Sequence, residues 1–308
     1  MSLPAGPPHN LTHLLATACR QTGVDPGDAR LLRHFANAVY LVSGAVARVD
    51  YGPDARTRSS KAVAVTRWLA GLGFPAVAPL DLPGALEQPI IVHDGGRDIA
   101  VTFWQYYPQP EPLPDRDFAA LGRIARQLHA IAEHPPTALP VYRSLTGLQV
   151  VLDMRPRSLD QHLCNWLSDR VSWLLEQEAT LKYPLGIGLI HADMYSGNMI
   201  YDDRHPRRPW LLGDWDSVCI GPREIDLVPT AAARRFGLDD ASVATLADAY
   251  GYDIRDWDGI EVLQQIRELS TLPALIRLAD SDPDSATELA YRLDSLQRGD
   301  TTVLWHRR

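Results

Sequence analysis

The chain has 308 residues, a length that allows one large domain or two of ordinary size. With 45% hydrophobic and 22% charged residues, its composition is that of a globular protein and excludes a disordered chain. With 30 basic and 38 acidic residues, the net charge is −8, which argues against a nucleic-acid partner and favours a cationic small molecule.

Lysine is rare in this sequence. Lys61 and Lys182 are the two lysines, so 30 − 2 = 28 of the basic residues are arginines. Any chemistry that requires a lysine therefore has two candidates. The cysteines, Cys19, Cys164 and Cys219, are odd in number and lack a CxxC spacing, which argues against a disulfide framework and a zinc site.

The N-terminal residues do not resemble a targeting signal. They lack a basic stretch followed by a long apolar one, and the chain has no run of about 18 apolar residues. We therefore expect a cytoplasmic protein without a membrane partner.

The first hundred residues favour strands after one opening helix. Short β-prone runs at Ala38–Leu41 and Ala45–Val49 flank a Ser-Gly turn and predict a hairpin. A helix is predicted over Lys61–Leu72, because the glycine and two prolines that follow end it there. A second hairpin is predicted from Ile90–His93 and Ile99–Phe103 across an Asp-Gly-Gly turn.

Beyond a proline-dense stretch the pattern becomes helical. Apolar residues recur at helical spacing over 118–132, over 159–174 and in the last 80 residues, and two short apolar strands lie at Ile187–Ile190 and Trp210–Leu212. The fold class is therefore α+β. We predict a β-rich N-terminal lobe (1–103), a hinge (104–114) and a mostly helical C-terminal lobe (115–308).

The densest group of polar residues follows the two apolar strands of the C-terminal part. Asp193 and Asn198 follow the first strand and Asp214 follows the second. Their side chains offer hard oxygen donors, the ligands that Mg²⁺ prefers, with substrate phosphates completing its coordination. The pattern indicates phosphoryl transfer to an alcohol, which needs a carboxylate beside the hydroxyl, a metal held by an Asn and an Asp, and a cation on the phosphates.

The spacing of these residues supports this interpretation. Asp193 and Asn198 are five positions apart, as in the kinase catalytic-loop signature HRDxxxxN. Asp214 follows Asn198 by sixteen positions, a separation that suits a β-hairpin bringing the second strand back beside the first.

These residues belong to two motifs that resemble those of a known family. Residues 191–198, HADMYSGN, and 213–216, GDWD, are similar to the paired motifs of the aminoglycoside phosphotransferase and choline kinase-like enzymes. The resemblance extends to 101–104, 121–122 and 267–269, and so covers about residues 30–300. It implies a bilobal protein-kinase-like fold and an ATP- and Mg²⁺-dependent small-molecule kinase.

The resemblance also implies roles for individual residues. Asp193 resembles the catalytic base, and Asn198 and Asp214 resemble the Mg²⁺ ligands. Asp216 is expected to support the metal or to face the substrate. Adenine is expected to bind at the hinge, near Trp104 and Tyr106, which are the predicted nucleotide-binding residues there.

The N-terminal lobe departs from the family pattern in two ways. The turn expected over the phosphates, residues 35–40, contains no glycine, so Asn37 and the backbone would make the contacts. The phosphate-binding lysine is replaced by Arg48, and arginine binds phosphate bidentately. The acidic residue that should orient this cation is missing from the following helix, where its position falls near Ala62.

The sequence argues against three other functions. An apolar strand followed by DWDSV at 214–218 resembles a haloacid-dehalogenase phosphatase motif, but that chemistry needs a downstream lysine and none follows Lys182. The absence of a GK dipeptide excludes a P-loop. A pseudokinase that only binds a ligand is the alternative from another class, and the intact base and metal ligands argue against it.

The acceptor is predicted from charge and aromatic residues near the motifs. Several acids lie there, and Glu268 on a late helix is expected to bind a protonated amine. Tyr195, Trp215 and Trp305 could stack on a sugar face or a cation. The prediction is a small amino sugar such as glucosamine, since the layout resembles actinobacterial glucosamine kinases. Antibiotic kinases of the aminoglycoside and capreomycin type are the alternative.

Overall fold

The computed structural model describes residues 10–34, 37–206 and 209–306. The chain forms two compact units, each assembled from separate stretches of sequence. The first unit comprises Met1–Arg116, Ala132–Leu139 and Gly197–Val218, and the second comprises Asp117–Ile131, Pro140–Ser196 and Cys219–Arg308. The first unit thus takes in a later stretch that contains the predicted strand before Asp214.

The first unit is built on a five-stranded antiparallel sheet in the order β1-β2-β3-β5-β4. Both predicted hairpins are confirmed, as β2–β3 and β4–β5. The edge strand β1 was not predicted from the sequence, because all five of its side chains are exposed. The bounds are α1 Leu11–Thr22, β1 Arg30–His34, β2 Ala38–Val42, β3 Ala45–Asp50, α2 Ala55–Gly71, β4 Ile90–Asp94 and β5 Arg97–Gln105.

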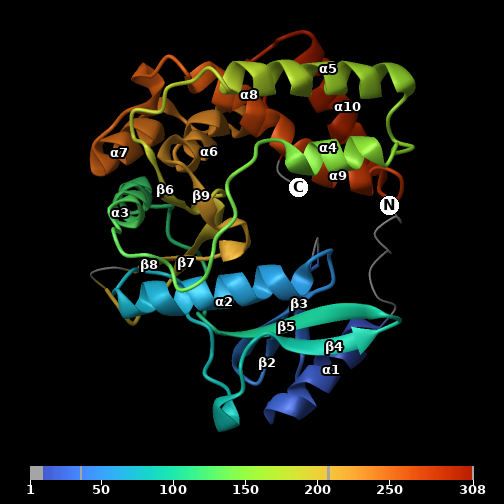
Figure 1. Cartoon of the computed structure of the whole chain (residues 1–308), viewed down its shortest axis with the longest axis vertical. Helices are drawn as coiled ribbons and strands as arrows, with labels where there is room; N and C mark the ends of the chain where they lie inside the picture. Colours follow the sequence, from blue (N-terminus) through green and yellow to red (C-terminus); the bar gives the residue numbers. More distant parts are fainter. Residues whose placement is uncertain (1–9, 35–36, 207–208, 307–308) are drawn as a thin grey trace. The chain divides into compact units, whose positions relative to one another are not determined.

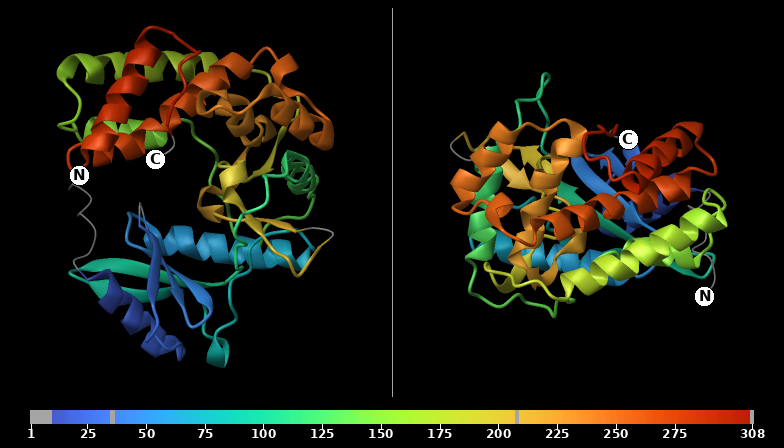
Figure 2. Two further views of the ribbon diagram at one scale, coloured as in Figure 1. Left: turned by 180° about the vertical axis from the view of Figure 1, so that it is seen from behind. Right: turned by 90° about the horizontal axis from the view of Figure 1, so that it is seen from above.

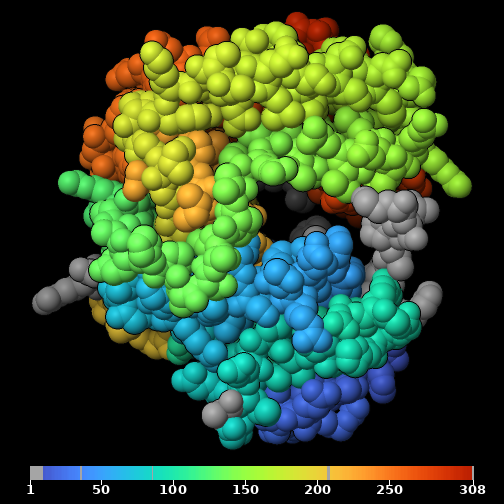
Figure 3. Space-filling model, viewed as in Figure 1, coloured from blue at the N-terminus to red at the C-terminus, as the bar shows by residue number. Residues whose placement is uncertain are grey.

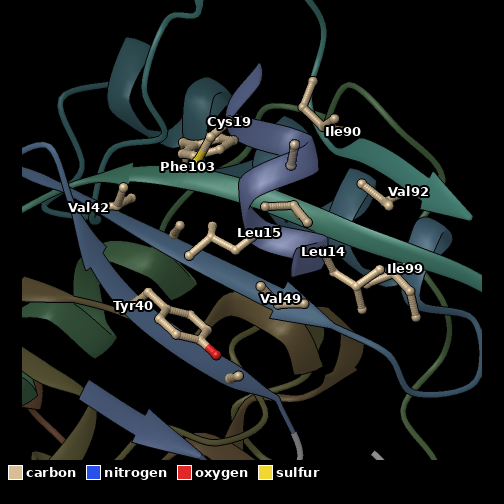
Figure 4. Packing of buried hydrophobic residues seen from close by; sticks show 14 of the residues in the cluster. Leu14, Leu15, Cys19, Tyr40, Val42, Val49, Ile90, Val92, Ile99 and Phe103 are labelled. Atoms are coloured by element: carbon tan, nitrogen blue, oxygen red, sulfur yellow. The ribbon is translucent and has the colours of Figure 1, made fainter. Parts of the chain in front are cut away.

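Two helices cover opposite faces of this sheet (Figure 1; Figure 2, left). On one face α1 packs its buried side chains, Leu14, Leu15 and Cys19 among them, against alternate residues of the strands. Figure 4 shows this cluster, with Val49 of β3 and Phe103 of β5 beneath the helix. Because strand residues alternate between faces, the residues between these core positions point to the α2 side.

A short antiparallel hairpin from later in the chain belongs to the first unit. A hairpin was expected here from the spacing of Asn198 and Asp214, but the expected partner of Trp210–Leu212 was Ile187–Ile190, which pairs with Cys219–Pro222 instead. The observed hairpin consists of β7 (Met199–Tyr201) and β8 (Trp210–Leu212). Leu212 joins it to the rest of the unit: its N–H donates to Pro75 at 2.8 Å, and its carbonyl accepts from Val77 at 3.0 Å.

The second unit is mostly helical, as predicted, around a two-stranded antiparallel ribbon of β6 and β9. Figure 3 shows α5 at the surface of this unit, beside α4. The bounds are α3 Phe118–His129, α4 Thr146–Asp153, α5 Gln161–Glu178, β6 Ile187–Ile190, β9 Cys219–Pro222, α6 Val228–Ala231, α7 Asp240–Tyr250, α8 Ile260–Ser270, α9 Leu272–Leu278 and α10 Pro283–Gln297. Among the described residues, none of the helices combines the length and apolar character needed to cross a bilayer.

Gly122 lets α3 approach α7 closely within the second unit. A Cβ at this position would lie 2.9 Å from the Cβ of Ala249 and would also collide with the backbone carbonyl of Leu246. We expect Gly122→Ala to destabilise the protein by about 1–3 kcal/mol, because the two helices must move apart. Urea unfolding measures this loss, and Gly147→Ala, where an added Cβ meets nothing closer than 3.9 Å, is the matched control. Equal stability of the two variants would contradict the prediction.

Candidate active site

Arg48 lies within β3, opposite Thr102 of β5. Its neighbours Ala47 and Val49 belong to the core beneath α1, so its own side chain points to the other face of the sheet. Burial lowers the pKa of the guanidinium, and the nearby carboxylate of Asp214 opposes that shift. Arginine keeps its charge under such conditions. The strand therefore presents a fixed cation on the α2 side.

Two side chains hold this guanidinium. Asp216 accepts hydrogen bonds from both Nη1 and Nη2 of Arg48 in a bidentate ion pair. Asn37, with its amide oxygen turned toward Arg48, accepts from Nε at 3.0 Å and from Nη2 at 2.6 Å. Asp216, predicted to support the metal or face the substrate, is thus observed on the arginine. Of the predicted phosphate turn at 35–40, Phe35 and Ala36 lie outside the described residues.

The pair is part of a network of three arginines and three aspartates within the first unit. Its members are spread over β1, β3, the start of α2 and the segment after β8. Equal numbers of the two charges leave the network electrically balanced before any ligand binds. The further contacts are Arg33–Asp214 (3.9 Å), Arg48–Asp214 (3.9 Å), Arg58–Asp216 (3.9 Å) and Arg58–Asp50 (2.7 Å).

The β7–β8 hairpin brings together the two predicted metal ligands. Asn198 directly precedes β7, and its carbonyl accepts from the N–H of Gly213 at 2.9 Å. Asp214 follows at once, in a left-handed backbone conformation (φ 58°, ψ 58°) that aspartate tolerates better than most residues. One amide and one carboxylate oxygen fit Mg²⁺, which uses few protein ligands together with phosphate oxygens. Among the described residues, no three His, Cys, Asp or Glu side chains form a metal cluster of their own.

The predicted adenine contacts lie at the end of β5. Trp104 is partly buried, donates from Nε1 to the hydroxyl of Thr102 at 2.8 Å, and pairs with Val46 on β3. Tyr106 follows the strand and is also partly buried. Trp104 is thus within the sheet and Tyr106 just beyond it, and their contact with adenine stays a prediction.

In the second unit, the loop after β6 is held by a buried carboxylate. Asp226 accepts from the backbone N–H of His191 at 2.8 Å and of Ala192 at 2.7 Å. It also pairs with Nε2 of His129 at 3.1 Å. Because a carboxylate can only accept, Nε2 carries the proton, and Nδ1 forms a hydrogen bond with the hydroxyl of Tyr250 at 2.9 Å. Burial raises the pKa of Tyr250 to about 12, which keeps that hydroxyl protonated.

Asp193 follows the two residues that Asp226 holds. Its backbone N–H donates to Nδ1 of His191 at 3.3 Å, so the side chain of His191 braces the loop. The carboxylate of Asp193 forms an ion pair with Arg267 of α8, with Nη1 to Oδ1 at 3.0 Å. Both side chains keep about a third of their surface exposed (33% and 28%). Asp193 is therefore an accessible carboxylate with a guanidinium beside it.

Glu268, predicted to bind the acceptor's amine, has a different contact. Its side chain is 12% exposed and pairs with buried Arg235 at 2.6 Å. Arg235 also lies 4.6 Å from the ring of Trp305, which is 4% exposed. The prediction that Trp305 stacks on a ligand is wrong, because the C-terminal segment folds its ring into the core. The same prediction is wrong for Trp215, which is 2% exposed and donates from Nε1 to the carbonyl of Leu212. Tyr195 is partly buried in the loop after Asp193, and its contact with an acceptor stays a prediction.

Two contacts of these site residues were not predicted from the sequence. Neither the pairing of Asp216 with Arg48 nor that of Arg267 with Asp193 has a local signal, because each joins residues far apart in the chain. The absence of any acid from α2 did show that Arg48 needs another partner, without showing which one.

Comparisons with known proteins agree with this architecture. A family model described as "Phosphotransferase enzyme family" matches residues 28–263, more than half of the chain. No curated protein matches the sequence. Among solved structures, an amicoumacin kinase in complex with AMP-PNP, Ca²⁺ and Ami has a TM-score of 0.71 at 13% identity, covering 97% of this chain and 96% of the other.

Two further structures have the same fold. A microcompartment-associated aminopropanol kinase has a TM-score of 0.70 at 19% identity and covers 94% of this chain and 98% of its own. A choline/ethanolamine kinase family protein from Mesorhizobium loti has a TM-score of 0.58 at 17% identity, covering 94% and 95%. The family match and the kinase-like fold together establish that the chain belongs to the phosphotransferase enzyme family and is a small-molecule phosphotransferase.

Proposed function

We propose that this protein transfers the γ-phosphoryl group of ATP, with Mg²⁺, to a hydroxyl of a small amine-bearing acceptor, an amino sugar such as glucosamine. The observation that carries the phosphoryl-transfer chemistry is the hairpin that sets Asn198 beside Asp214, in the unit that also holds Arg48. The residues present are those that hold a metal and the phosphates of a nucleotide.

In this mechanism each residue has a defined task. Arg48 binds the phosphates, and Asn198 and Asp214 hold the metal. Bound Mg²⁺ neutralises charge on the phosphate oxygens. Asp193 orients the acceptor hydroxyl and takes its proton while the hydroxyl oxygen forms a bond to the γ-phosphorus. The bond from that phosphorus to the β–γ bridging oxygen breaks, and ADP leaves.

Two solved structures of the same fold support an amine on the acceptor. Aminopropanol, choline and ethanolamine, named for two proteins of the same fold, each combine a hydroxyl with a nitrogen cation. An amino sugar has the same two groups on a ring that Tyr195 is suited to contact.

The test is ADP release from the purified protein with MgATP and a panel of acceptors. The panel holds glucosamine, aminopropanol, ethanolamine, choline, aminoglycosides and capreomycin, with glucose as the neutral match for glucosamine. We expect glucosamine to exceed glucose in kcat/KM by about tenfold or more, since one ion pair in a desolvated site is worth that much. EDTA should abolish turnover, and excess Mg²⁺ should restore it.

The panel also separates the alternatives. Turnover with an aminoglycoside or capreomycin and none with glucosamine would replace the amino sugar by an antibiotic acceptor. Equal rates with glucose and glucosamine would contradict an amine-selective site. The Asp193→Asn protein, prepared in the same way, corrects for contaminating kinases.

A further inference from the structure

The helix that follows β3 lacks the acid that a kinase-like site requires. Protein kinases hold the phosphate-binding cation of the third strand with a glutamate from the next helix. Here that helix, α2, has the sequence ARTRSSKAVAVTRWLAG, which contains neither Asp nor Glu. Position 62, where the acid would be expected, is a buried alanine. Arg48 must therefore receive its orientation from another element.

The hydrogen bonds of Arg48 account for four of its five N–H groups. Asp216 accepts one N–H from each terminal nitrogen, Nη1 and Nη2. Asn37 accepts the N–H of Nε and the second N–H of Nη2. Among the described residues, the fifth N–H, on Nη1, has no hydrogen-bond acceptor, and this nitrogen lies 3.9 Å from Oδ1 of Asp214. That donor is thus on the side of the proposed metal ligand, where phosphate oxygens would bind.

Helix α2 contributes a cation in place of the missing acid. Arg58, in its first turns, binds the buried carboxylate of Asp50 through Nε at 3.0 Å and Nη2 at 2.7 Å. The same Nε lies 3.9 Å from Asp216. Asp216 therefore sits between two guanidinium groups, those of Arg48 and Arg58. Helix α2 therefore carries a cation where protein kinases carry an acid, and the acid that binds Arg48 lies after β8.

We propose that Asp216 is the positioning residue of Arg48 and does for it what the helix glutamate does in protein kinases. The proposal rests on the function proposed above, because it assumes that Arg48 binds ATP. Asp216 is two positions after Asp214, in the short 3₁₀ helix Trp215–Ser217. One segment then supplies both a metal ligand and the partner of the phosphate-binding cation, so the two are set together.

A double-mutant cycle tests this role. The four proteins are the wild type, Asp216→Asn, Arg48→Met and the double variant, and AMP-PNP binding with Mg²⁺ is measured by calorimetry without an acceptor. Asp216→Asn should weaken AMP-PNP binding about tenfold, as expected when a charged partner is lost, and should raise the KM for ATP with little change in the KM for the acceptor. In the Arg48→Met background it should have no further effect, because Asp216 acts through Arg48. Asp216→Glu, which keeps the charge, should recover part of the affinity.

A matched control comes from the same unit. Asp98 forms an exposed ion pair with Arg56 of α2 at 2.9 Å, and Asp98→Asn should leave AMP-PNP binding unchanged. Tighter AMP-PNP binding by Asp216→Asn would overturn the proposal, since Asp216 would then compete with phosphate for Arg48. An additive effect in the double variant, or a rise confined to the acceptor's KM, would also overturn it. Because binding is measured without turnover, a wild type that binds AMP-PNP but phosphorylates no acceptor contradicts the proposed function alone.

Discussion

Replacing Asp193 with asparagine is expected to lower kcat by about 10³-fold or more while the KM for ATP stays near its wild-type value. General-base groups contribute roughly 10²–10⁴ to enzymatic rates, and the amide of asparagine cannot accept the proton of the acceptor hydroxyl. The nucleotide contacts should survive, because Arg48, Asn198 and Asp214 belong to the other compact unit. Steady-state kinetics with the best acceptor of the panel, together with AMP-PNP binding, measure both quantities.

A surface aspartate of the second unit provides the control. Asp280 lies in the exposed turn between α9 and α10, and Asp280→Asn should leave both constants unchanged. If Asp193→Asn kept more than about a tenth of the wild-type kcat, the assignment of the base would fail, because that loss is below the contribution of a general base. If it also lost AMP-PNP binding, a folding defect would be the cause, and circular dichroism would show it.

Replacing Asp226 with asparagine is expected to be the most destabilising single change in the second unit. The carboxylate accepts from two backbone N–H groups and from His129, and it is almost fully buried. An isosteric amide would turn its own N–H groups toward one of these donors. We expect a loss of about 3–5 kcal/mol in the free energy of unfolding, the range for breaking a buried charged pair.

The same substitution should also affect the reaction. His191 and Ala192 precede Asp193 directly, so loss of their anchor should speed amide exchange at 191–192 and lower kcat in the folded fraction. Urea unfolding and hydrogen exchange measure the two effects. Asp253→Asn, which removes a partly exposed ion pair in the same unit, is expected to cost less than about 1 kcal/mol. Similar losses for the two variants would show that Asp226 is not the anchor of the loop.

Some elements of this fold could be predicted from the sequence, because the residues that determine them are close together in the chain. Ala38–Leu41 and Ala45–Val49 were recognisable as a hairpin because the strands and their turn lie within a dozen residues. The spacing of Asn198 and Asp214 predicted a hairpin, but its first strand, Met199–Tyr201, was not recognised because it is three residues long. The start of α2 was placed at Lys61, whereas the helix begins at Ala55, since the polar residues of its first turns carry no apolar periodicity.

The partners of charged residues could not be predicted in the same way. The sequence shows that Arg48 and Glu268 are charged, but the carboxylate or guanidinium that each meets is decided by long-range packing. Glu268 is on the helix expected to line the acceptor side, and it pairs with Arg235 because the C-terminal segment folds over that arginine. Asp216 meets Arg48 because the β7–β8 hairpin joins the first unit.

The attachment of β8 to residues 75–77 has a consequence for how the chain folds as it is synthesised. When the first 116 residues have been made, the backbone groups of Pro75 and Val77 still lack Leu212, their partner in the finished unit. The first unit is completed only when residue 218 has left the ribosome, after the whole of the stretches 117–131 and 140–196 of the second unit. Synthesis of the second unit therefore begins before the first unit is complete, and an N-terminal fragment ending at the hinge would lack both proposed metal ligands. No single cut in the chain separates the two units from each other.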